Sequence, residues 1–204
     1  RTTVFLKGCP LRCKWCSNPE SQLSRVQIMY HSDNCLHCQK CVHNCPEKAI
    51  TAAEDGRIHI DFNKCTGCLS CVQGCPGRAL TNEGEYKTAD EVVDVCMQDV
   101  NFYEESSGGV TISGGEPMLQ HEFVYELTEA LHAEGIHVAV DTSGIVPLNL
   151  CRKAVDAADM LLLDIKSLDP ALSQRITGSP ECLKREKELL DHCEATGKRV
   201  WIRH

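Results

Sequence analysis

Apolar and polar positions along the chain follow two alternating periods. Short apolar runs predict strands at residues 2–6, 109–113, 137–143, 160–166 and 199–204. The segments between them carry apolar residues at helical spacing and predict helices at about 119–134, 148–157 and 180–195. Thr88 and Glu91 predict a capping box at the start of another helix, which extends to about residue 105. Strands separated by helices imply parallel βαβ units, so the sequence predicts an α/β fold.

Each predicted strand runs into a polar motif. The motifs are KGCPLRCKWCSNP at residues 7–19, SGGEP at 113–117, DTSG at 141–144, DIK at 164–166, and Arg203. Because the carboxyl ends of parallel strands form the ligand site of α/β sheets and barrels, we expect these five segments to meet at one pocket. The last strand stops at His204 with nothing to cover it. We therefore expect a partial, open parallel β/α barrel that is incomplete at its C-terminus.

An internal repeat interrupts this pattern. CLHCQKCVHNCPEKAI begins at Cys35 and CTGCLSCVQGCPGRAL begins at Cys65, an offset of thirty residues. Both read C-x2-C-x2-C-x3-C-P, which resembles the bacterial ferredoxin run, in which the fourth cysteine binds the cluster of the other repeat. The resemblance implies two 4Fe-4S clusters, one on Cys35, Cys38, Cys41 and Cys75 and the other on Cys65, Cys68, Cys71 and Cys45. We predict a ferredoxin-like two-cluster domain at residues 26–83, with repeats at about 26–55 and 56–83, inserted into an α/β domain made of residues 1–25 and 84–204.

Composition narrows the alternatives. Of the 15 cysteines, eleven fall into three tight clusters, a spacing that suits metal ligands better than disulfides and indicates a reducing, anaerobic cytoplasm. Zinc is the structural alternative, but a zinc ribbon needs only two cysteine pairs and leaves the other cysteines and their proline without a role. A net charge of −8 and the lack of any long apolar run argue against nucleic-acid binding and membrane insertion.

The first cysteine cluster is the most informative about function. Cys9, Cys13 and Cys16 lie within eight positions and have no fourth cysteine beside them. Three thiolates leave one iron of a 4Fe-4S cluster open to a substrate. This C-x3-C-x2-C loop after the first strand, with GGE after the second, resembles the radical S-adenosylmethionine (SAM) superfamily. The two ferredoxin-type runs directly behind the loop resemble the glycyl-radical-enzyme activating enzymes, relatives of pyruvate formate-lyase activase.

The resemblance implies roles for the other motif residues. Gly114, Gly115 and Glu116 approach the SAM ammonium, and Asp164, Ile165 and Lys166 contact its methionine and ribose portions. Asp141, Thr142 and Ser143 make polar contacts to SAM or a cation, and Arg203 pairs with its carboxylate. Trp15, Cys16 and Ser17 line the adenine side. The alternatives are an ordinary Gly-Gly turn, an exposed Asp164–Lys166 salt bridge, and a Trp15 lid that keeps water off the cluster.

The resemblance also implies an activity. It is an oxidoreductase activity that reductively cleaves SAM to a 5′-deoxyadenosyl radical, which removes hydrogen from a glycine of a partner glycyl-radical enzyme. Three 4Fe-4S clusters and SAM are the implied cofactors, and a flavodoxin- or ferredoxin-type protein is the implied electron donor. Two alternatives stay open: a radical SAM enzyme acting on a small molecule or peptide, and an iron–sulfur electron-transfer protein with a defunct SAM site. For the isolated cysteines Cys96, Cys151, Cys182 and Cys193, core packing or a harmless surface thiol is the expected role.

Overall fold

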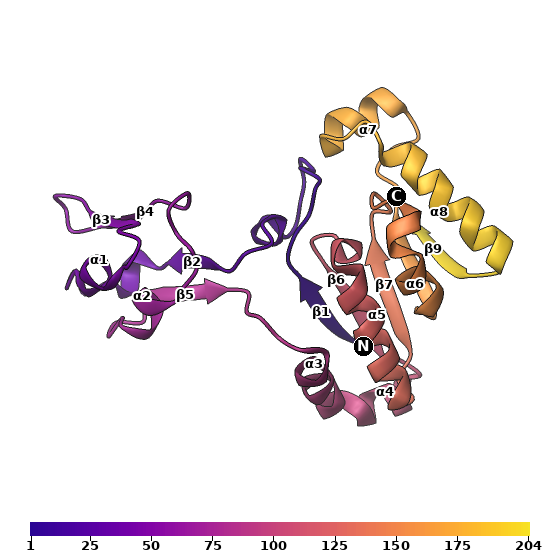
Figure 1. Ribbon diagram of the computed structural model, residues 1–204, viewed down its shortest axis with the longest axis horizontal. Coiled ribbons are helices and arrows are strands. Elements are labelled where there is room, and N and C mark those ends of the chain that lie inside the picture. The colour runs from indigo at the N-terminus through magenta and orange to yellow at the C-terminus, as the bar shows by residue number, and fades with distance from the viewer. The chain divides into compact units, whose positions relative to one another are not determined.

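The computed structural model describes residues 1–204 and divides them into two compact units. The first unit combines Arg1–Ser24 with Lys87–His204, and the second is Arg25–Tyr86. The second unit is therefore an insertion into the first, and each is described by itself below (Figure 1).

The first unit is built on a five-stranded sheet in the order β1-β6-β7-β8-β9. Every neighbouring pair is parallel, which confirms the predicted α/β fold with a parallel sheet. The strands are β1 (Thr2–Leu6), β6 (Val110–Gly114), β7 (Val138–Thr142), β8 (Met160–Asp164) and β9 (Arg199–Arg203). Their order in the sheet follows their order in the chain. Because all neighbouring pairs are parallel, the five carboxyl ends lie at one edge of the sheet.

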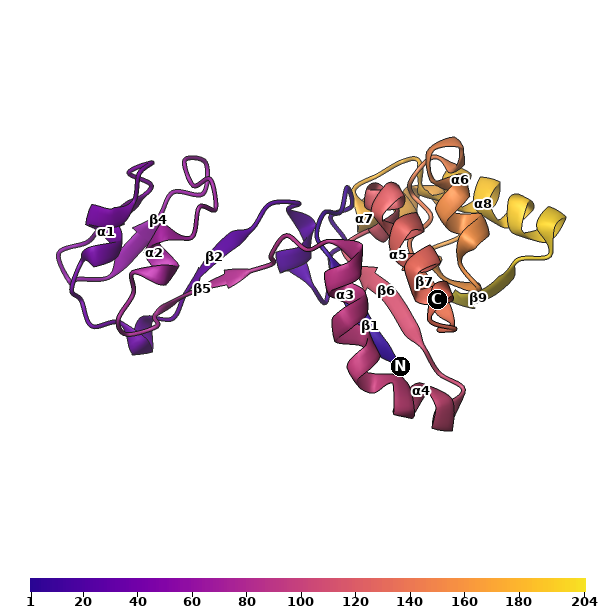
Figure 2. The same ribbon diagram turned by 60° about the horizontal axis from the view of Figure 1, so that its bottom comes forward.

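Helices connect these strands and lie along one face of the sheet (Figure 2). They are α3 (Ala89–Cys96), α4 (Val100–Ser106), α5 (His121–Ala133), α6 (Leu148–Ala157), α7 (Pro170–Thr177) and α8 (Cys182–Thr196). Short 3-10 turns occupy Pro19–Gln22, Met97–Asp99 and Pro117–Gln120. None of the helices combines the length and the apolar character needed to cross a membrane.

The prediction of one helix from Thr88 to about residue 105 is confirmed at its start and wrong in its continuity. The capping box is confirmed, because Glu91 N donates to Thr88 Oγ1 at 3.3 Å and Thr88 N donates to Glu91 Oε2 at 2.8 Å. Its continuity is wrong, since the 3-10 turn Met97–Asp99 separates α3 from α4. The Tyr103 hydroxyl donates to the carbonyl of Cys96 at 2.9 Å and stabilises this break from the side.

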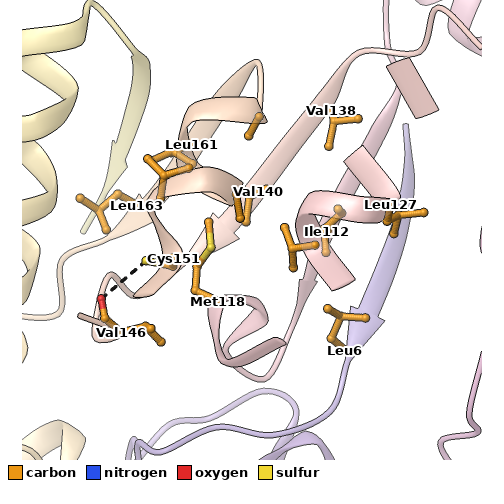
Figure 3. Packing of buried hydrophobic residues seen from close by; sticks show 14 of the residues in the cluster. Leu6, Ile112, Met118, Leu127, Val138, Val140, Val146, Cys151, Leu161 and Leu163 are labelled. Carbon is orange, nitrogen blue, oxygen red and sulfur yellow. Dashed lines mark hydrogen bonds between the residues drawn. The ribbon is translucent and has the colours of Figure 1, made fainter. Parts of the chain in front are cut away.

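The core lies between the sheet and its helices (Figure 3). Ile112, Val140 and Leu161 come from three adjacent strands and are completely buried. Leu127 of α5 and Cys151 of α6 pack against them from the helical side. The four isolated cysteines, Cys96, Cys151, Cys182 and Cys193, are all buried, so of the two expected roles the structure supports core packing.

The second unit contains two small antiparallel ribbons. β2 (Gln27–Tyr30) pairs with β5 (Leu80–Glu83), and β3 (Ile50–Ala52) pairs with β4 (Ile58–Ile60). Two short helices, α1 (Lys40–Asn44) and α2 (Ser70–Gln73), and a 3-10 turn at Ser32–Asn34 complete it. Ile28, Ile50, Ile60 and Leu80 form its core together with Cys71.

The sequence repeat of this unit is also a repeat of backbone conformation. Positive φ angles occur at three pairs of positions thirty residues apart, His37 and Gly67, Gln39 and Leu69, and Lys48 and Arg78. Five of these six residues are not glycine, so the left-handed conformation is imposed by the loop and not by local preference. Alternating right- and left-handed residues point successive N–H groups into one concavity, an arrangement that many iron–sulfur sites use.

Candidate functional site

The carboxyl ends of the five parallel strands surround one cavity of about 650 Å³. Predicted site residues from all five polar motifs line it, namely Cys9, Cys13, Trp15, Cys16, Ser17, Gly114, Gly115, Asp141, Thr142, Ser143, Asp164, Lys166 and Arg203. The structure thus brings thirteen of the fifteen residues predicted around the open cluster and SAM to one place. The two that do not line it are Glu116 and Ile165.

The cysteine loop follows β1 directly and is fixed by backbone hydrogen bonds. Gly8 N donates to Ser21 O at 2.7 Å, and Arg12 N donates to Thr177 O at 2.8 Å. Cys9 and Cys13 are half-buried, whereas Cys16 is exposed. Burial raises the pKa of the Cys13 thiol, and the nearby Lys166 ammonium opposes this shift. The loop therefore presents its thiols beside a cation that favours thiolate.

The Gly-Gly pair has a packing role in addition to any ligand role. Gly114 has φ +114°, and a Cβ atom on it would lie 2.2 Å from the carbonyl oxygen of Leu6. A Cβ atom on Gly115 would lie 2.3 Å from the carbonyl oxygen of Gly8. Glu116 N donates to that same Gly8 oxygen at 2.7 Å. Only glycine lets the end of β6 approach the cysteine loop this closely.

Glu116 lies beneath the cavity floor and is 1% exposed. Its Oε1 accepts from Thr142 Oγ1 at 2.7 Å and from Met118 N at 3.0 Å, while its Oε2 accepts from Ser143 N at 2.8 Å and from Ser143 Oγ. Burial raises the pKa of Glu116, and the hydrogen bonds from Ser143 and Thr142 offset part of that shift. The carboxyl group ties the ends of β6 and β7 together, and its acceptor capacity is used within the protein.

Charged side chains form a chain of contacts across the cavity. Arg203 Nε donates to Asp164 Oδ1 at 2.6 Å, and Lys166 Nζ donates to Asp164 Oδ2 at 2.7 Å. Arg203 also donates to Asp141, whose second oxygen accepts from Ser113 Oγ at 3.0 Å. Burial raises the pKa of Asp141 although Arg203 opposes it, whereas at Asp164 the hydrogen bonds from Arg203 and Lys166 outweigh burial and lower the pKa. Both charge signs are therefore available to a zwitterionic ligand.

The second unit places its eight clustered cysteines around two further cavities. Each cavity combines three cysteines of one repeat with one of the other: Cys35, Cys38, Cys41 and Cys75 line the first, and Cys45, Cys65, Cys68 and Cys71 line the second. Burial raises the pKa of Cys71 to about 11, and Cys65 and Cys45 add to the shift because they are close. Ala49 N donates to Cys45 Sγ at 3.2 Å, and Ala79 N donates to Cys75 Sγ at 3.3 Å, so the two fourth cysteines have equivalent donors.

Comparison with known proteins assigns the chain to a family. Residues 3–204 match the model of the radical SAM superfamily. The chain belongs to the radical SAM superfamily. It is 42% identical over 180 residues to the choline trimethylamine-lyase activating enzyme of Oleidesulfovibrio alaskensis, 41% over 185 residues to the benzylsuccinate synthase activating enzyme of Thauera aromatica, and 43% over 179 residues to the trans-4-hydroxy-L-proline dehydratase activating enzyme of Clostridioides difficile.

These matches cover most of this radical SAM chain but only part of each relative. They include 87%, 88% and 87% of this chain, and 58%, 56% and 59% of the respective relatives. The chain thus spans a little over half the length of the curated relatives it matches.

The residues present fit the 4Fe-4S cluster that membership of the radical SAM superfamily implies. Three thiols from one loop face the cavity, and its lining contains neither a fourth cysteine nor a histidine. No group of three or more His, Cys, Asp or Glu side chains is arranged to hold a single metal ion. A 4Fe-4S cluster needs thiolates that lie further apart than the ligands of a single metal ion, because each thiolate binds a separate iron.

Sequence reasoning missed part of this radical SAM cavity. Thr3 and Phe5 of β1 also line it. Their signal was the alternation in β1, where Val4 packs against the core and its neighbours point the other way. Ile165 is 8% exposed, and its N–H donates to Arg203 O at 3.0 Å. Ile165 is therefore held against the end of the neighbouring strand β9 and does not line the cavity.

Proposed function

We propose that this chain is the SAM-cleaving part of a glycyl-radical-enzyme activating enzyme. In this function a reduced 4Fe-4S cluster supplies one electron that cleaves SAM to methionine and a 5′-deoxyadenosyl radical, and that radical removes hydrogen from a glycine of the partner enzyme. The observation that carries the proposal is the cavity at the strand ends, where three cysteine thiols and both charge signs face one space. The names of the relatives, all activating enzymes, support the same class.

Each side chain in the cavity has a defined part in this function. Cys9, Cys13 and Cys16 hold the cluster and leave one iron open. Asp164, Lys166 and Arg203 are already mutually paired, so they supply a preorganised set of charges for the carboxylate and ammonium groups of SAM. Trp15 is 57% exposed although it lines the cavity, which leaves its ring face free to cover an adenine.

The buried Glu116 changes the role assigned to the GGE motif. Its carboxyl oxygens accept hydrogen bonds from Met118, Thr142 and Ser143, so we assign it to positioning Thr142 and Ser143 at the cavity wall. The contact with the SAM ammonium then falls to the backbone carbonyls beside Gly114 and Gly115, where the absence of side chains permits close approach.

We further propose that residues 25–86 form a ferredoxin-like domain with two auxiliary 4Fe-4S clusters. The four-cysteine cavities, the donors to Cys45 and Cys75, and the repeated left-handed residues support this assignment. A flavodoxin- or ferredoxin-type protein of a reducing, anaerobic cytoplasm is the proposed electron donor. The proposed partner is a lyase, synthase or dehydratase of the glycyl-radical type.

The test is an anaerobic assay for 5′-deoxyadenosine formed from SAM by reconstituted, reduced protein. The Cys13→Ala variant should form none, whereas Cys193→Ala, which removes a buried thiol of α8 outside the cavities, should retain the activity. Product from the unaltered protein and from Cys193→Ala, with none from Cys13→Ala, supports SAM cleavage at the three-cysteine site. A fully iron-loaded protein that forms no product would contradict the proposal and favour electron transfer. Glycyl-radical formation is then followed by electron paramagnetic resonance on mixing with a candidate partner.

A further inference from the structure

The two cysteine cavities of the second unit are related by the thirty-residue repeat, and at three pairs of equivalent positions both members place a large aliphatic or aromatic side chain in the cavity wall. The first cavity is lined by Tyr30, Ile58 and Leu80, and the second by Ile60, Ile28 and Ile50. Two of the three pairs exchange one aliphatic side chain for another. The third pair differs in chemistry, because Tyr30 of the first cavity corresponds to Ile60 of the second.

Tyr30 brings a buried polar atom to the first cavity. It is the last residue of β2, where it pairs with Leu80 of β5, and this pairing directs its side chain toward the cysteines. Its hydroxyl oxygen is buried and has no hydrogen-bond partner within the protein. Tyr30 and Cys35 line the same cavity. A buried hydroxyl without a partner is costly, so this one points to a bound group that accepts from it.

We propose that the Tyr30 hydroxyl donates a hydrogen bond to a sulfur of the iron–sulfur cluster held by Cys35, Cys38, Cys41 and Cys75. The inference rests on the two-cluster assignment of the proposed function. Reduction adds negative charge to the cluster, and a donor stabilises the more negative state more strongly. The hydrogen bond from Tyr30 thus keeps the reduction potential of this cluster above the value it would have with an apolar neighbour.

The second cavity lacks this donor but has hydroxyl groups at other positions, because Thr66 lines it where Leu36 lines the first, and Ser70 lies beside Cys68. Ser70 Oγ lies 3.5 Å from Cys68 Sγ, and the equivalent residue of the first repeat is Lys40. Cys68 is exposed, so water competes for its sulfur, whereas the Tyr30 hydroxyl is shielded from solvent. A shielded donor acts in a lower dielectric and has the larger effect. The two clusters are therefore tuned by separate hydroxyl groups at non-equivalent positions.

The test is a redox titration followed by electron paramagnetic resonance, made on protein that carries Cys13→Ala so that only the auxiliary clusters titrate. Iron and sulfide are measured first. Tyr30→Phe should lower one of the two potentials by an amount equal to roughly a tenfold change in the reduction equilibrium, which is about 59 mV for one electron. Ser70→Ala should lower the other potential, by less. Tyr86→Phe is the matched control, since Tyr86 is 83% exposed and lines no cysteine cavity.

A second measurement leaves the side chain in place. Fluorotyrosine has a more acidic hydroxyl and is a stronger donor, so protein labelled with it should show the opposite shift of the same potential. Unchanged potentials in fully loaded Tyr30→Phe protein would overturn the inference while leaving the proposed function intact. The inference would also be overturned if Tyr30→Phe and Ser70→Ala shifted the same potential, or if the only effect of Tyr30→Phe were a loss of iron. Fewer than two clusters in the unaltered insertion would overturn both the inference and the two-cluster assignment.

Discussion

At the scale of the residue, two buried carboxyl groups affect the stability of the protein in different ways. Glu116 and Glu186 are 1% and 2% exposed, yet their surroundings differ. Glu116 accepts hydrogen bonds on both oxygens from the ends of β6 and β7. Glu186 of α8 has one oxygen without any partner. A buried carboxyl is stabilising in the first setting and costly in the second, so the same substitution should have opposite effects at the two sites.

Replacing Glu116 with Gln should destabilise the protein. Met118 N and Ser143 N can only donate, and each faces a different oxygen of the carboxyl group. An amide places an NH₂ group against one of these donors, so we expect a loss of about 2 kcal/mol and a fall in Tm of roughly 4–8 °C. Thermal unfolding followed by circular dichroism measures this. Glu126→Gln, on the exposed side of α5, should leave the Tm unchanged; equal melting of all three proteins would contradict the assigned role.

Replacing Glu186 with Gln should instead remove a pH dependence of stability. Burial raises the pKa of Glu186 from 4.5 to about 7, although Lys166 opposes the shift. Between these two values the folded protein binds more protons than the unfolded chain, so its stability falls as pH rises and levels off above about 7. The loss across this whole range amounts to about 3 kcal/mol. Tm measured from pH 5 to 8 should decline less in Glu186→Gln than in the unaltered protein, while the exposed Glu194→Gln should follow the latter. Parallel curves for all three would rule out this origin.

At the scale of the element, strand ends and loops determine the site, and they differ in how far the sequence predicts them. The convergence of five motifs follows from parallel strand order and could be predicted from the apolar runs alone. The burial of Glu116 could not, because it depends on Thr142 and Ser143 of a neighbouring strand pointing at it. Helix α7 was also missed, although Asp169 caps it by accepting from Leu172 N at 2.8 Å and Pro170 opens it. That local signal lay between stronger apolar patterns.

The repeats of the insertion lead to a prediction about which cysteines bind the same cluster. Cys75 belongs to the second repeat but lines the cavity of Cys41. Cys75→Ala and Cys41→Ala should therefore abolish the same one of the two auxiliary cluster signals, with a loss of about four iron atoms per chain. Cys45→Ala and Cys71→Ala, each made as a single variant, should both abolish the other signal. Iron analysis and spin quantification on reduced protein measure this. Loss of one signal by Cys75→Ala and of the other by Cys41→Ala would mean that each repeat binds its own cluster.

At the scale of the whole molecule, the chain holds three groups of cysteines in two units, and one group alone lacks a fourth ligand. The SAM cleavage that we propose needs one electron of low potential at that group. Ferredoxin-type clusters work in this range, at about −400 mV. The two auxiliary clusters that we propose therefore suit a relay between an external protein donor and the three-cysteine site. A purely structural role for the insertion is the competing explanation.

Cys38→Ala separates a relay from a structural role. Cys38 is exposed and lines only the first auxiliary cavity, so its loss should impair that cluster and leave the three-cysteine loop intact. If the cluster relays electrons, turnover with a protein donor should fall at least tenfold, while single-turnover SAM cleavage by protein reduced beforehand should be unchanged. Formation of 5′-deoxyadenosine under the two regimes measures both, with Cys193→Ala as the control. Equal loss in both regimes would contradict the relay, and equal loss with a lowered Tm would show that the first auxiliary cluster holds the protein together.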